Sequence, residues 1–155
     1  MRYLLIDRIT GLSPPGRATG VKCVSLSDDC FVDHFPGHPV MPGALILEAL
    51  AQLGGVLVEA SIREKGRGDL LALLAMVDRA RFRSPVRPGD RLELEVSGST
   101  VSEDGGRVSG VAKVDGNTVA EAELTFAFAK VASEKALARR KAVVDVWLNG
   151  SAEDP

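Results

Sequence analysis

The sequence has few cysteines, few aromatic residues and almost no net charge. Its 155 residues include two cysteines, Cys23 and Cys30, 5% aromatic residues and a formal net charge of −2. Two cysteines outside any Cys-x-x-Cys pair form neither a disulfide framework nor a metal site, so we expect small apolar core residues in a reducing compartment. No basic run with interleaved aromatic residues occurs, which argues against a nucleic-acid-binding protein.

Long apolar segments are lacking as well. No apolar stretch reaches the roughly 20 residues that a membrane helix needs without polar breaks. The apolar run at the N-terminus is too short for a signal peptide, and Asp7 and Arg8 follow it directly. We therefore expect a cytoplasmic protein without a membrane segment. The length and the 45% of hydrophobic residues fit one domain with a buried core.

One segment is apolar on nearly every side, and strands are predicted after it. Residues 44–64 form this segment, and such a pattern is typical of a buried helix. Residues 69–129 predict antiparallel strands with hairpin turns at 104–106 and 115–117. The continuous apolar run at 70–77 is typical of a strand covered on both faces. We predict an α+β fold, with an antiparallel sheet wrapped around one long central helix.

The remaining segments lie at the two ends of the chain. Residues 18–26 predict a further strand, and residues 130–148 a second helix with Ser133 as a possible N-cap. Residues 149–155 predict a disordered tail. The expected organisation is one domain at 1–130, a helical extension at 131–148 and the tail.

Two polar side chains, Glu48 and Gln52, interrupt the apolar helix four positions apart, so they share one face. A buried glutamate is costly unless it is neutralised, paired or used. Burial raises the pKa of a carboxyl group because the charged form loses water, and such an acid can donate a proton near neutral pH. Glu48 is therefore a candidate general acid. A hydrogen-bonded core glutamate, or one at a subunit contact, fits the same pattern.

A stiff loop leads into this helix. Residues 34–43 begin with His34 and contain three prolines and two glycines. The first N–H groups of a helix are unsatisfied and carry partial positive charge, and Gly43 has no side chain to block its amide. Such an amide can hold a carbonyl oxygen on which negative charge develops. With His34 as base, or His38 as the competing histidine, the segment holds the groups that remove a proton next to a thioester carbonyl and expel a β-hydroxyl.

The same residues are familiar as a motif. Residues 34–52 read HFPGHPVMPGALILEALAQ and closely resemble the signature of bacterial (3R)-3-hydroxyacyl-[acyl-carrier-protein] dehydratases, G-H-F-P-G-x-P-x-x-P-G-x-x-x-x-E-x-x-A-Q. The separation of 14 positions between His34 and Glu48 matches the family's catalytic pair. Residues 78–90, DRARFRSPVRPGD, resemble a second family stretch, D-x-A-R-F-x-x-P-V-x-P-G-D. The resemblance covers about residues 2–129.

The resemblance implies a hot-dog fold and a hydro-lyase that needs no cofactor or metal. The enzyme would convert (3R)-3-hydroxyacyl chains on acyl carrier protein into trans-2-enoyl chains, in the biosynthesis of fatty acids or related chains. His34 would remove the C2 proton, Glu48 would assist the leaving 3-hydroxyl, the Gly43 amide would polarise the carbonyl, and the Val40 carbonyl would orient His34. Glutamate at position 48, rather than aspartate, implies little isomerisation of the double bond.

The resemblance also implies homodimers, or trimers of dimers, in which one subunit supplies the histidine and the other the glutamate. The sequence departs from the family at Asp33, where glycine is common, and at His38, where lysine or arginine is common. Residues 70–77 lack the aromatic residues often found on that strand. A basic patch would steer the acidic carrier protein, and four arginines are candidates for it: Arg79, Arg81, Arg83 and Arg87. A solvated strand and turn would explain the same arginines equally well.

Two other functions stay open at this point. A hot-dog acyl thioesterase would use Glu48 to activate water and would have little use for His34. A non-catalytic acyl-chain-binding protein would need neither residue, whereas the sequence has both. Substitution of His34 separates the thioesterase from the dehydratase.

Overall fold

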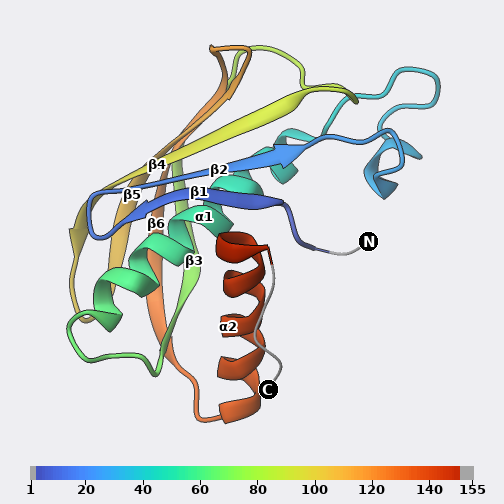
Figure 1. Cartoon of the computed structure of the whole chain (residues 1–155). Helices are drawn as coiled ribbons and strands as arrows, with labels where there is room; N and C mark the ends of the chain where they lie inside the picture. Colours follow the sequence, from blue (N-terminus) through green and yellow to red (C-terminus); the bar gives the residue numbers. More distant parts are fainter. Residues whose placement is uncertain (1–2, 151–155) are drawn as a thin grey trace.

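A curved antiparallel sheet wraps around one long helix, and a second helix lies beside that helix (Figure 1). The structure is a computed structural model and describes residues 3–150. Its elements are β1 (Arg8–Ser13), β2 (Arg17–Cys23), the short 3-10 helix η1 (Asp29–Phe31), α1 (Gly43–Arg63), β3 (Leu70–Phe82), β4 (Arg91–Val101), β5 (Gly105–Val114), β6 (Asn117–Lys130) and α2 (Glu134–Asn149). The predicted α+β class is confirmed.

The six strands form a single sheet in the order β1-β2-β4-β5-β6-β3, with every neighbouring pair antiparallel. The hairpin between β5 and β6 turns at Asp115 and Gly116, whose φ angles of 50° and 80° are those of the tight turn predicted there. Strand β3 precedes β4 in sequence but pairs with β6, so it forms one edge of the sheet, and β1 forms the other.

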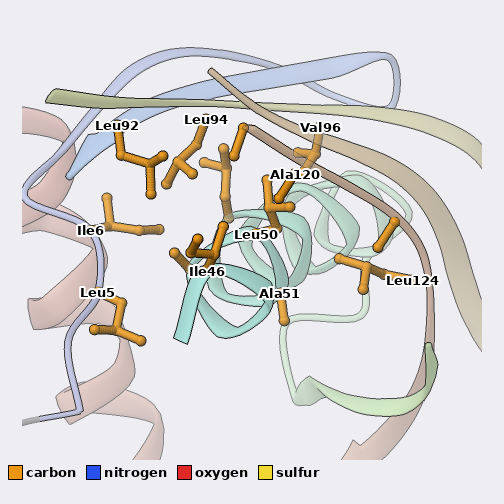
Figure 2. Packing of buried hydrophobic residues seen from close by; sticks show 14 of the residues in the cluster. Leu5, Ile6, Ile46, Leu50, Ala51, Leu92, Leu94, Val96, Ala120 and Leu124 are labelled. Atoms are coloured by element: carbon orange, nitrogen blue, oxygen red, sulfur yellow. The ribbon is translucent and has the colours of Figure 1, made fainter. Parts of the chain in front are cut away.

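Helix α1 fills the concave side of the sheet, as its apolar sequence predicts. Figure 2 shows Ile46 and Leu50 of the helix on the side that faces Leu94 of the sheet, within one buried cluster. Leu50, Leu53 and Leu57 are fully buried. By length and composition α1 could cross a membrane, but 72% of its apolar 18-residue segment is buried inside the protein. A core helix of a water-soluble domain has these properties.

The prediction for residues 70–77 is wrong in the single chain. They begin β3, which lies at the sheet edge, and four of their apolar side chains are exposed: Leu73, Leu74, Met76 and Val77. A continuous apolar run shows that a strand needs cover on both faces, but it does not show which chain provides that cover.

Helix α2 begins three residues later than the predicted extension at 131–148. Ser133 caps it as predicted, because its hydroxyl accepts a hydrogen bond of 3.2 Å from the amide of Ala136. At the other end Asn149 is still helical, and Gly150 ends the helix with a φ of 78°. The rest of the predicted tail, residues 151–155, lies outside the described residues. Trp147 is the buried anchor of the helix.

Candidate active site

His34 sits in a loop that is held by main-chain hydrogen bonds. The amide of Val40 donates to the carbonyl of His34 at 3.0 Å, and Phe35 and His38 exchange two further bonds across the loop. The imidazole Nδ1 lies 2.7 Å from the Val40 carbonyl oxygen. Because a carbonyl oxygen only accepts, Nδ1 carries a proton, and in the neutral imidazole Nε2 is then the nitrogen with the lone pair. The predicted contact between Val40 and the His34 ring is therefore present.

A hollow of about 500 Å³ opens beside this imidazole. It is lined by the loop at residues 34–43, the first turn of α1, the end of β3 and the residues after it: His34, Val40, Met41, Gly43, Ala44, Ile46, Phe82, Arg83, Ser84, Pro85 and Val86. Gly43 is the first residue of α1, so its amide has no acceptor within the helix. The structure thus brings His34, Val40 and Gly43 together at one hollow, as the sequence predicts.

The ring of Phe82 explains why position 43 is glycine. A Cβ atom at this position would lie 2.7 Å from the nearest ring carbon of Phe82, closer than real contacts allow. The absence of a side chain lets the ring lie over the helix start next to the exposed amide. The A-R-F part of residues 78–90 contains Phe82, but the sequence does not show that its ring lies against Gly43.

Glu48 lies one turn further along α1 and is held by a different set of residues. Its Oε1 accepts a hydrogen bond of 3.1 Å from Nε2 of Gln52. Gln52 also donates to the carbonyl of Tyr3 and accepts from the amide of Leu5, both at 3.0 Å. The pair on one helix face was visible in the sequence, but its link to residues 3–5 was not. Glu48 is half-buried rather than sunk in the core.

The single chain does not join the two predicted catalytic side chains. Glu48 does not line the hollow at His34, and within residues 3–150 no hydrogen bond or ion pair connects it to His34. Glu48 is accessible on the chain surface, and so is the hollow that holds the imidazole. Within one chain, as far as residues 3–150 describe it, the two side chains therefore do not form an acid–base pair.

The four arginines proposed for carrier docking divide into two places. Arg83 lines the hollow at His34, and an Nη atom of Arg87 lies 3.3 Å from Nε2 of His38 in the loop at residues 34–43. Arg79 and Arg81 line a separate hollow that also contains Glu121 and Glu123.

Of the four arginines, only Arg83 and Arg87 therefore lie beside the loop at residues 34–43. Arg83 forms an ion pair of 2.7 Å with Glu121. The carboxylates of the other hollow pair with different residues, Glu121 with Arg83 and Glu123 with Arg107.

Comparison with known proteins agrees with this geometry. Residues 1–123 match the model of the FabA-like domain family. The chain is 53% identical over 125 residues to the 3-hydroxyacyl-[acyl-carrier-protein] dehydratase FabZ of Bacillus velezensis, which covers 81% of this chain and 86% of that protein. It is 48% identical, again over 125 residues, to the protein of the same name from Roseiflexus castenholzii, with 81% and 85% covered.

Solved structures share the fold at low sequence identity. A chain of the dehydratase heterocomplex ApeI:P from Xenorhabdus doucetiae matches with a TM-score of 0.69 and 19% identity over 88% of each chain. The protein smu.793 from Streptococcus mutans matches with a TM-score of 0.63 and 14% identity, over 79% of this chain and 88% of that one. The predicted hot-dog fold is confirmed, and the sequence match over most of the chain shows that this protein belongs to the FabA-like domain family.

Proposed function

We propose that this protein is a 3-hydroxyacyl-[acyl-carrier-protein] dehydratase of acyl-chain biosynthesis in the cytoplasm. The observation that carries the proposal is the hollow in which an oriented imidazole and a free helix-start amide face the same space. Relatives named as such dehydratases match over the whole segment that builds the hollow. Their names give no support to the thioesterase or to a non-catalytic acyl binder.

In this reaction Nε2 of His34 removes a proton from C2 of the substrate. The electron pair of that C–H bond forms the C2=C3 double bond, and the C3–O bond breaks. The hydroxyl leaves as water with a proton from Glu48. The Gly43 amide donates to the thioester oxygen while negative charge develops there. Bonded to Val40, the His34 ring cannot turn its protonated nitrogen toward the substrate.

The acid and the base come from different subunits of a homodimer in our proposal. Strand β3 presents a free edge with exposed apolar side chains, and such an edge is a template for pairing with another strand. Pairing of two β3 edges around a two-fold axis would also bring the end of β3, which lines the His34 hollow, next to a second chain. Glu48 of that chain is then available to complete the site. Association of three such dimers is a further expectation, which light scattering tests.

Two single substitutions test the chemistry. We expect His34→Ala and Glu48→Gln each to lower kcat by about 10²–10⁴-fold, the usual contribution of one general acid or base. The measurement is the hydration of a trans-2-enoyl thioester on acyl carrier protein and the reverse dehydration. Glu64→Gln, an exposed change beyond the end of α1, is the matched control and retains activity. A wild-type protein that processes neither substrate would remove the assignment.

Mixing the two inactive variants tests the shared site. In a mixed dimer one site loses both groups, while the other combines the intact His34 of one chain with the intact Glu48 of its partner. Random pairing should therefore restore about a quarter of the wild-type activity. If both groups came from one chain, the mixture would stay as inactive as its components.

The carrier protein is the proposed partner, and Arg83 and Arg87 are its proposed contacts. Reversing both charges with glutamate should raise the KM for the carrier-bound substrate and leave the KM for a small thioester analogue unchanged. The same reversal at Arg79 and Arg81, which line a different hollow from that of His34, should have the smaller effect. Equal effects on both substrates would contradict carrier docking at these arginines.

A further inference from the structure

A second cavity, of about 440 Å³, lies between α1, β3 and α2. Helix α2 forms one of its walls and crosses in front of α1 in Figure 1. Its apolar lining comes from four elements: Leu12, Val56, Leu71, Leu137, Val144 and Leu148. The volume is within the range of small-molecule sites, which are mostly apolar with a few polar groups. It shares no lining residue with the hollow at His34.

The wall formed by α2 is fixed to α1 by a buried ion pair. Glu59 of α1 is only 4% exposed, and its Oε2 accepts a hydrogen bond of 3.0 Å from Nε of Arg140 on α2. Its other oxygen accepts from the amide of Ala72 at the start of β3, also at 3.0 Å. The guanidinium of Arg140 lies 5.8 Å from the ring centre of Trp147. Three elements thus meet at one carboxylate, so the cavity is a built part of the fold.

The charges around the cavity leave one cation unmatched. Of the charged residues that line it, Glu59 pairs with Arg140, and Lys141 pairs with Asp145 at 2.7 Å. Arg63, at the end of α1, is exposed and has no hydrogen-bond or ion-pair partner among residues 3–150. Arg63 is therefore the one lining cation without a partner among the residues that the structure describes.

We propose that this cavity binds a fatty acid, with the alkyl chain against the apolar lining and the carboxylate at Arg63. A guanidinium matches a carboxylate in both charge and planar geometry. Each CH₂ group removed from water contributes about 0.8 kcal/mol, so the apolar lining selects an alkyl chain over a sugar or nucleotide. The site is separate from the dehydration reaction, and its occupant would bridge α2 to the helix that carries Glu48.

Titration of the full-length protein with dodecanoate tests the site. Isothermal titration calorimetry should show saturable binding, and the emission of Trp147, the only tryptophan, should change with it. Arg63→Gln should weaken binding about tenfold, close to the loss of one charged contact. Ala138→Phe, which adds a ring at an exposed lining position, should weaken it as well. Lys135→Gln, an exposed cation of α2 outside the lining, is the matched control and should bind as wild type.

A neutral ligand and the enzyme assay separate this site from the catalytic hollow. 1-Dodecanol should bind wild type more weakly than dodecanoate, and Arg63→Gln should remove most of that difference. Arg63→Gln should leave the kcat for dehydration unchanged. The binding test therefore does not depend on whether His34→Ala loses activity. Absence of saturable binding would overturn the proposal. The proposal would also be overturned if dodecanoate bound Arg63→Gln and Ala138→Phe as tightly as wild type and competed with the enoyl thioester. Dodecanoate would then occupy the hollow at His34.

Discussion

Gln52 is the side chain through which the N-terminal segment reaches the proposed acid. Its amide nitrogen donates hydrogen bonds to Glu48 and to the carbonyl of Tyr3, and its amide oxygen accepts one from the amide of Leu5. Because the oxygen already accepts from Leu5, the nitrogen must face Glu48, so the orientation of the amide is fixed by the backbone. Gln52 is therefore a positioning residue for the carboxyl group.

We expect Gln52→Ala to lower kcat roughly tenfold with little change in KM, as is usual when the orienting partner of a functional group is lost. Gln52→Glu should be worse, because it replaces a donor by a second carboxylate beside Glu48. Steady-state kinetics over a range of pH measures both effects and would show an altered profile for the acid. A lower melting temperature with unchanged kcat would mean that Gln52 only fastens residues 3–5.

Asp69, just before β3, gives a pH-dependent contribution to stability. A hydrogen bond of 3.1 Å from Nε of Arg67 lowers the pKa of this carboxyl below its usual value. A pKa that is lower in the folded state than in the unfolded state stabilises the fold at neutral pH, and this contribution is lost as the pH falls through the folded value. Asp69→Asn should therefore lower Tm at pH 7 and converge with wild type in acid. Melting curves at stepped pH measure this, and a constant difference across the series would contradict it.

The observed helices and strands match the sequence-based prediction closely where neighbouring residues determine them. They match it less closely where contacts between distant residues do. The limits of α1 were predicted to within one residue at each end because its apolar face, the proline before it and the glycines after it are local signals. The loop at His34 was likewise predicted from its prolines and glycines. The pairing of Glu59 with Arg140 spans 81 positions, and no periodicity reports such a contact. The exposure of β3 was missed for the same reason, since its neighbours are set by topology.

The ion pair between α1 and α2 predicts a large effect for one truncation. Arg140→Ala leaves Glu59 buried without its counter-charge and should cost about 3 kcal/mol, as broken buried pairs do. Chemical denaturation measures the free energy of unfolding. Adding Glu59→Gln should recover part of the loss, because a neutral amide is cheaper to bury. Arg139→Ala, the exposed neighbour, is the control, and an equal loss there would contradict a specific role for Arg140.

The single chain places the two proposed catalytic side chains at different surfaces. The hollow with His34 opens near the end of β3, while Glu48 is held on α1 by residues 3–5. The exposed edge of β3 is long and apolar, and soluble proteins rarely leave such an edge uncovered. In the proposed dimer, folding of each chain would produce two half-sites and the strand edge that joins them. Association and catalysis should for that reason be lost together.

A charge placed on the β3 edge tests whether association and catalysis are lost together. Leu74→Lys should yield a monomer by analytical ultracentrifugation, because pairing would bury an unpaired ammonium group. Circular dichroism should stay that of wild type, since Leu74 is exposed in the single chain and contributes little to the core. Dehydration should fall as far as in Glu48→Gln, although both catalytic side chains are intact. Leu26→Lys, at an exposed leucine away from the sheet, should remain dimeric and active. A Leu74→Lys monomer with full activity would mean that each chain builds its own site, and the proposed division of His34 and Glu48 between subunits would be wrong.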